Sequence, residues 1–103
     1  MAIKHVVVFQ FKPAVSESEI AQFMAALNSF VGTIPGCLDF NWGPYAGPFP
    51  GGEGSNKGFT HGFIMTWADR ESRASYLPHP LHQDFVKKWL GIVDDLVAFD
   101  FEA

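Results

Sequence analysis

IKHVVVFQF, residues 3–11, consists mainly of β-branched and aromatic side chains, which are typical of a β-strand. Successive side chains of a strand point to opposite faces, so Val7 and Phe9 share one face and Val6 and Val8 share the other. Both faces are therefore apolar in the middle of the strand. A strand of this kind has to be covered by other parts of the structure on both sides.

A helix is predicted after this strand. Ser16 and Glu19 have the spacing of a capping box, in which each side chain bonds to the backbone N–H group of the other residue. Apolar residues then recur at helical spacing and form one stripe that must pack on a sheet. The stripe consists of Ile20, Phe23, Met24, Leu27, Phe30 and Val31. We expect the helix to end at Gly32 and the Pro35–Gly36 pair.

The rest of the chain alternates between strand and helix patterns. The predicted elements are strands at residues 37–45 and 59–67, a short helix from Asp69 that ends before Pro78, a helix from Pro80 and a strand at residues 96–101. Residues 43–58 are rich in glycine and proline, and we expect them to form a long, mobile hairpin connection.

The predicted order is β-α-β-β-α-β, with the second helical segment broken at Pro78–Pro80. This order favours an α+β fold of the ferredoxin-like type, an antiparallel sheet with its helices on one face. The other face would expose Val6, Val8 and Ile64. A second copy of the same sheet is the simplest cover for them, so we expect a homodimer. We expect residues 1–103 to form a single domain.

The composition narrows the range of functions. The 103 residues are 48% hydrophobic and 17% charged, as expected for one compact folded domain. The net charge is −4, and basic residues are not clustered, so we expect no nucleic-acid partner. The single cysteine excludes an intrachain disulfide and favours a reducing compartment. Since no apolar run is long enough to span a membrane, we expect no membrane partner and a cytoplasmic location.

Three histidines occupy positions where the pattern calls for an apolar side chain. His5 and His61 lie on the apolar faces of predicted strands, and His82 lies on the apolar stripe of a helix. Tyr76 precedes His82 by six residues, across the break at Pro78–Pro80. A buried imidazole stays neutral at pH 7 and can act as a base, and a nearby phenol can stabilise an enolate. These groups would suffice to remove a proton next to a carbonyl without a cofactor.

A structural interpretation of these residues remains open. A histidine on an apolar face is commonly a packed side chain with a satisfied hydrogen bond, and Tyr76 could be a core ring. Metal chemistry has less support, because His79 and His82 alone do not complete a zinc site. The simplest role of Cys37 is that of a small buried residue.

Three stretches carry a resemblance to a known family. IKHVVVFQFK, GFTHGFIMTW and YLPHPLHQDF resemble the corresponding motifs of stress-responsive A/B-barrel domain (Dabb) proteins, which belong to the dimeric α+β barrel superfamily. The similarity runs along essentially the whole chain, and it is greatest to a plant polyketide cyclase of that family. The resemblance implies a dimer whose two sheets pair into a barrel. It also implies the intramolecular aldol condensation of a linear polyketide thioester.

The resemblance further implies roles for individual residues. The second histidine of the H-P-x-H motif, His82, would be the general base, and Tyr76 would position the carbonyl. His5 and His61 would have supporting roles. The alkyl tail of the substrate would bind among the phenylalanines Phe9, Phe23, Phe63 and Phe85.

The family chemistry requires no cofactor, although some members bind a structural magnesium ion through backbone carbonyls. The matching positions are Val31, Ile34 and Cys37. The long connection at residues 43–58 and the phenylalanine-rich walls depart from the cyclase and would reshape its pocket.

Three functions follow as hypotheses. The first is a polyketide cyclase-like lyase acting on a poly-β-ketone or related small carbonyl compound. The second is a non-catalytic stress-response protein that functions as a dimer. The third is a cofactor-free monooxygenase.

Overall fold

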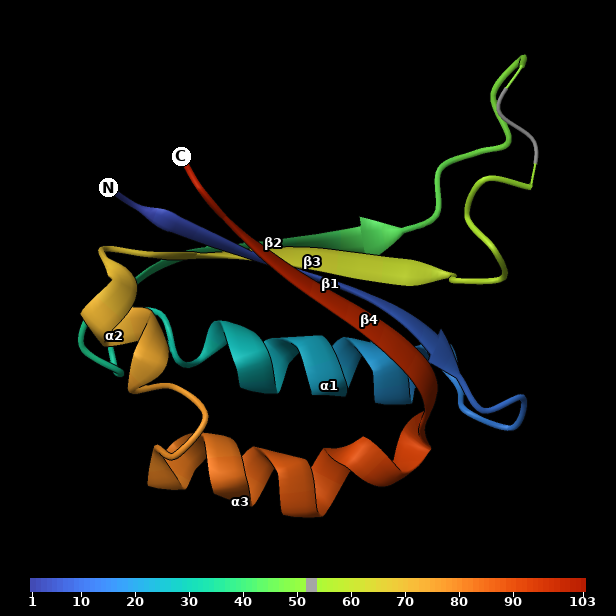
Figure 1. Cartoon of the computed structure of the whole chain (residues 1–103). Coiled ribbons are helices and arrows are strands. Elements are labelled where there is room, and N and C mark those ends of the chain that lie inside the picture. The colour runs from blue at the N-terminus through green and yellow to red at the C-terminus, as the bar shows by residue number, and fades with distance from the viewer. Residues whose placement is uncertain (52–53) are drawn as a thin grey trace.

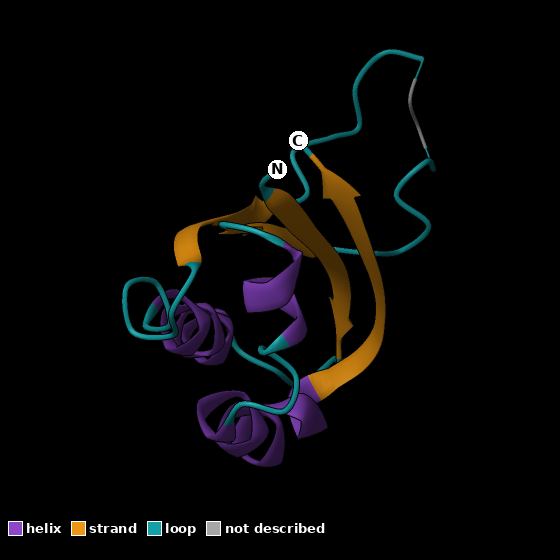
Figure 2. Cartoon of the chain, turned by 60° about the vertical axis from the view of Figure 1, so that its left-hand side comes forward, coloured by secondary structure: helices purple, strands orange, loops and turns teal. Residues whose placement is uncertain are grey.

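The sheet has four antiparallel strands in the spatial order β2-β3-β1-β4, and the helices pack on one of its faces (Figures 1 and 2). The structure of the chain is a computed structural model, which describes residues 1–51 and 54–103. The elements in chain order are β1 (Ile3–Phe11), α1 (Glu17–Asn28), β2 (Cys37–Pro44), β3 (His61–Trp67), α2 (Arg70–Ala74), α3 (Pro80–Trp89), the 3₁₀ turn η1 (Leu90–Ile92) and β4 (Val93–Glu102). The predicted ferredoxin-like order is confirmed.

The central strand β1 organises the core. Its inner side chains alternate with outer ones as predicted, and Ile3, Val7 and Phe9 are buried. Helix α1 lies on this inner face and buries Ile20, Phe23, Met24 and Leu27 there. The helix ends at Asn28, earlier than predicted, so Phe30 and Val31 of the predicted stripe lie in the turn that follows it. The predicted capping box begins the helix, because Ser16 Oγ accepts from Glu19 N–H at 3.1 Å and Glu19 Oε1 accepts from Ser16 N–H at 3.2 Å.

Element boundaries differ from the prediction at four strand ends. Strand β2 ends at Pro44, β3 begins at His61, and β4 extends over residues 93–102. Strand β4 is longer than expected because Val93 and Asp95 pair with the end of β1. The 45–60 connection joins β2 to β3, and its described parts, residues 45–51 and 54–60, extend away from the sheet, as Figure 1 shows. Residues 52–53 of the expected mobile connection lie outside the described residues.

The face of the sheet opposite the helices carries exposed apolar side chains. Val6 lies opposite Ile64 on β3 and Phe99 on β4, and Val8 lies opposite Val97. Phe99 is 66% exposed. We call these five residues the outer sheet face. Within the described ranges, no helix is long and apolar enough to cross a membrane.

The turn before β2 fixes the position of α2. Gly36 has a φ of +86°, and its carbonyl accepts from Ala68 N–H at 2.8 Å. A Cβ atom at Gly36 would collide with the Cβ of Ser72 in α2. Gly32 also has a positive φ, +75°, but a Cβ there would meet no atom within 4 Å. Close approach of the turn to α2 therefore requires glycine at Gly36.

Substitution of these two glycines by alanine should separate backbone strain from the collision. We expect Gly32→Ala to lower the free energy of unfolding by about 1 kcal/mol, through the positive φ alone. Gly36→Ala should lower it by about 3 kcal/mol, because overpacking against Ser72 is added to the same strain. Urea unfolding measures both values. Equal losses in the two variants would show that α2 does not depend on this contact.

Candidate active site

A cavity of about 270 Å³ lies between the inner face of the sheet and the helices. Most of its wall is apolar, and the four phenylalanines predicted to bind a substrate tail all line it. Its lining residues include His5, Phe9, Phe23, Phe63, Arg73, Tyr76, Leu77, His82 and Phe85. An apolar cavity with a few polar groups is the usual form of a small-molecule site.

The polar end of this cavity is formed at the break between α2 and α3. Helix α2 ends at Ala74, and α3 begins at Pro80, whose missing N–H group suits the first turn of a helix. Tyr76 lies in the segment between the two helices, and His82 lies in the first turn of α3. Their ring centres are 4.4 Å apart at an interplanar angle of 60°. The structure thus brings together the base and the phenol predicted from the sequence.

A backbone carbonyl orients the imidazole of His82. The Nδ1 atom lies 3.2 Å from the carbonyl oxygen of Leu77. Because a carbonyl only accepts hydrogen bonds, Nδ1 carries the proton in this contact, and Nε2 keeps its lone pair. Nε2 is therefore the atom of His82 that can take a proton from a ligand.

Burial keeps both groups neutral. Burial lowers the pKa of His82 from its ordinary value; the positive charge of Arg73 lowers it further, and the Leu77 hydrogen bond opposes this. Burial also raises the pKa of the Tyr76 phenol, which is 2% exposed. At neutral pH the site therefore presents an imidazole that can accept a proton and a phenol that can donate a hydrogen bond.

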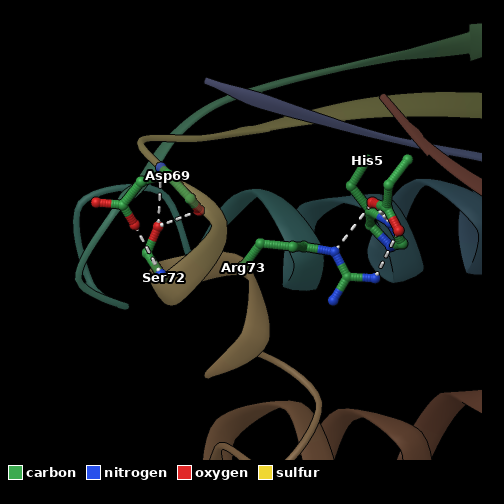
Figure 3. Close-up of polar contacts among 5 residues, drawn as sticks. His5, Asp69, Ser72 and Arg73 are labelled. Atoms are coloured by element: carbon green, nitrogen blue, oxygen red, sulfur yellow. Dashed lines mark hydrogen bonds and ion pairs between the residues drawn. The ribbon is translucent and has the colours of Figure 1, made fainter. Parts of the chain in front are cut away.

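His5 adds a second buried imidazole to the wall. Its Nδ1 atom lies 2.8 Å from Oδ1 of Asp100 on the neighbouring strand β4. Asp100 in turn accepts from Arg73. The close-up in Figure 3 shows the Arg73 side chain extending from α2 toward His5. The sequence prediction did not include Arg73 or Asp100. An acidic residue that shares the inward face of β4 with Leu96 and Ala98 was the signal that could have revealed Asp100.

His61 lies elsewhere. It lines a hollow beside the 45–60 connection that shares no lining residue with the cavity. Its Nδ1 atom is 2.8 Å from Oγ1 of Thr60, and its ring packs edge-on against Phe11. The structure therefore does not bring His61 to Tyr76 and His82, and its supporting role stays a prediction.

The family of the Stress responsive A/B Barrel Domain matches residues 3–103. The chain belongs to this family. The stress-response A/B barrel domain-containing protein HS1 of Arabidopsis thaliana is 30% identical over 100 residues, which cover 97% of this chain and 88% of that protein. Olivetolic acid cyclase of Cannabis sativa is 28% identical over 101 residues, which cover 98% of this chain and 96% of the cyclase.

Solved structures share the fold of this A/B barrel domain. The crystal structure of the Arabidopsis thaliana protein At3g17210 superposes with a TM-score of 0.89 at 30% identity and covers 98% of this chain and 94% of its own. Hydroxynitrile lyase from Passiflora edulis has a TM-score of 0.84 at 21% identity, with 97% and 91% coverage. A dimeric ferredoxin-like protein of unknown function from Jannaschia has a TM-score of 0.82 at 22% identity, with both chains fully covered. Proteins with this fold thus include enzymes and proteins without a known activity.

The magnesium ion implied by the resemblance finds no support in this A/B barrel domain. The Ile34 carbonyl accepts from Cys37 N–H at 3.0 Å, and the Cys37 carbonyl accepts from Gly32 N–H at 3.1 Å. In the part of the chain that is described, no group of three or more His, Cys, Asp or Glu side chains is placed to hold a metal ion. The carbonyls of Ile34 and Cys37 close the turn before β2, and we assign no chemistry to an ion at Val31, Ile34 and Cys37.

The cavity histidines should make stability depend on pH. Burial, the largest cause in both cases, lowers the pKa of His5 and of His82 in the folded state. As the pH falls below about 6.5, the unfolded chain therefore takes up protons before the folded one, and the free energy of unfolding decreases. Urea unfolding at about pH 7.5 and pH 5.5 measures this decrease.

Two variants show whether the cavity causes the effect. In His82→Gln the decrease should be smaller than in the wild type. His79→Asn is the matched control, because His79 lies outside the cavity and caps α3 by accepting from Leu81 N–H, which asparagine can also do. A decrease that is the same in the wild type and in His82→Gln would contradict the assignment.

Proposed function

We propose that this A/B barrel domain is a cofactor-independent cyclase. It would cyclise a poly-β-ketone or related carbonyl compound through an intramolecular aldol-type reaction. One observation carries the proposal. A neutral imidazole and a neutral phenol, 4.4 Å apart between ring centres, lie at the polar end of a mainly apolar cavity. The chain's 28% identity to a protein named olivetolic acid cyclase supports the same class of reaction.

The reaction needs only proton transfers and one new carbon–carbon bond. His82 Nε2 takes a proton from a methylene group between two carbonyls, and the Tyr76 hydroxyl donates a hydrogen bond to the carbonyl oxygen on which negative charge develops. The enolate carbon attacks a second carbonyl of the same molecule. The resulting alkoxide takes the proton back from the His82 imidazolium. The aldol product is an isomer of the substrate, so neither an oxidant nor a reductant is consumed.

The cavity also limits the substrate. Its volume of about 270 Å³ lies just below the usual range of small-molecule pockets, roughly 300 to 1,000 Å³. The rings of Phe9, Phe23 and Phe85 lie at successive edge-on contacts of 5.2 and 5.0 Å between ring centres. We propose that this aromatic wall holds the apolar tail of a small substrate while its carbonyl groups face Tyr76 and His82.

Removal of either proposed catalytic group should abolish turnover. We expect His82→Gln and Tyr76→Phe each to lower the rate of cyclisation by at least about 100-fold, because the first lacks the base and the second lacks the donor to the enolate oxygen. A synthetic poly-β-ketone thioester is the substrate, and mass spectrometry of the cyclised product is the measurement. His79→Asn should keep the wild-type rate.

Three other results would each replace the proposal. Cyclisation that persists unchanged in both His82→Gln and Tyr76→Phe would remove the assigned roles. Oxygen consumption with a phenolic substrate would indicate a cofactor-free monooxygenase. Absence of any turnover, with wild-type stability in His82→Gln, would indicate a non-catalytic stress-response protein.

We also propose that two copies of the chain pair through the outer sheet face. The helices leave this face uncovered, and it carries adjacent apolar residues on three strands. An uncovered apolar patch of this kind on a small domain suits a self-complementary twofold contact. The description of the Jannaschia protein as dimeric supports the same arrangement.

A charge placed on the outer sheet face should therefore dissociate the dimer. We expect Phe99→Glu to give a monomer, since a buried, unpaired carboxylate would be strongly unfavourable. Phe49→Glu is the matched control, because Phe49 is equally exposed, at 65%, but lies on the 45–60 connection. Light scattering after size-exclusion chromatography gives the masses. Identical masses for the wild type and both variants would refute pairing through this face.

A further inference from the structure

Arg73 is an arginine at the cavity wall to which the proposed reaction gives no task. It lies in the last turn of α2, its side chain is only 17% exposed, and it lines the cavity. Its Nε and Nη2 atoms donate to the two carboxylate oxygens of Asp100 at 3.0 and 3.2 Å (Figure 3). This two-point contact fixes the plane of the carboxylate. Arg70 on the same helix differs, because its side chain is 79% exposed and pairs with Glu102 outside the cavity.

The carboxylate held by Arg73 also holds His5. Oδ1 of Asp100 accepts from both Arg73 Nε and His5 Nδ1, and Asp100 lies directly opposite His5 in the pairing of β4 with β1. Since an ionised carboxylate only accepts, the proton of the neutral imidazole lies on Nδ1. Nε2 of His5 then carries a lone pair and has no protein partner among the described residues.

The free nitrogen of His5 is open to the cavity. Among the described residues, Trp67 Nε1 is a fully buried side-chain nitrogen without a hydrogen-bond partner. Nε2 of His5 does not belong to this class, so it is not completely enclosed by protein atoms. His5 lines the cavity, and its ring lies 5.9 Å from that of Tyr76. A ligand beside Tyr76 in this cavity would therefore lie next to the His5 ring.

We propose that Arg73 is a positioning residue of this site, which orders Asp100 and thereby holds His5 as a neutral hydrogen-bond acceptor toward the ligand. The inference rests on the proposed function for the nature of the ligand. Tyr76 offers a donor and His5 an acceptor, so the two together select a carbonyl oxygen beside a hydroxyl hydrogen. The enol form of a β-dicarbonyl compound has both groups.

Burial and the charge of Arg73 together favour the neutral state of His5. A carboxylate alone beside an imidazole favours the charged imidazolium. The ionisable groups that face His5 are Asp100 from β4, Arg73 from α2, Tyr76 from the segment after α2, and His82 from α3. Burial and then the charge of Arg73 lower the pKa of His5, and together they outweigh the contribution of Asp100 that raises it. Arg73 is the permanent positive charge in this group, so its removal should favour the imidazolium.

Titration of His5 by nuclear magnetic resonance tests the inference on the full chain without any ligand. In Arg73→Gln the pKa of His5 should rise by about one pH unit, and in Asp100→Asn it should fall below the wild-type value, because the group that favours the charged form is removed. Arg73→Lys should restore part of the wild-type pKa. Arg70→Gln is the matched control and should leave it unchanged. Nitrogen-15 spectra should show the proton of neutral His5 on Nδ1 in the wild type.

The outcomes separate this inference from the proposed function. A His5 pKa in folded Arg73→Gln equal to that of the wild type would overturn the inference, as would a wild-type His5 protonated at Nε2. If Arg73→Gln does not fold, the direction of the shift in Asp100→Asn decides, and a rise there overturns the inference. Because no turnover is needed, the expected shifts together with a failure to cyclise the thioester would overturn the proposed function alone.

Discussion

Strand β1 is apolar on both faces, and the helices of one chain can cover only one of them. The positions of the core, the cavity and the outer sheet face all depend on this constraint. The covered face holds the core and the cavity, where low polarity shifts the protonation of His5, Tyr76 and His82 toward their neutral forms. The uncovered face keeps exposed apolar side chains such as Phe99. The proposed reaction and the proposed pairing of two chains therefore use opposite sides of the same strand.

The break between α2 and α3 gives the covered face its polar end. A continuous helix would have satisfied its own backbone groups and turned successive side chains away from one another. The interrupted chain instead leaves the Leu77 carbonyl free to accept from His82 and directs the Tyr76 ring onto the same imidazole. The turn is held by hydrogen bonds from Tyr76 N–H to the Arg73 carbonyl and from His79 N–H to the Tyr76 carbonyl, each 3.1 Å long. One local irregularity thus brings the phenol and the imidazole together and orients the imidazole.

The trio of Arg73, Asp100 and His5 is difficult to explain by stability. The Arg73 side chain is only 17% exposed, whereas Asp100 is 39% exposed, so the cost of removing charge from water falls mainly on Arg73. The exposed pair of Arg70 and Glu102 shows that α2 and β4 can also be linked at the surface, where little desolvation is involved. A partly buried ion pair at a cavity wall is therefore better explained by the orientation it imposes on His5 than by the energy it contributes.

Sequence patterns predicted the features that depend on one segment of chain. The capping box at Ser16, the faces of β1 and the pairing of Tyr76 with His82 across six residues all follow from local spacing. Asp100 and His5 are 95 residues apart, and their contact depends on the register of β4 against β1, which local spacing does not encode. His61 shows the same limit, because alternation indicates which way a side chain points but not whether a cavity lies at that point along the strand. The helix break brings the Tyr76 phenol and the His82 imidazole together. The register of β4 against β1 brings Asp100 to His5.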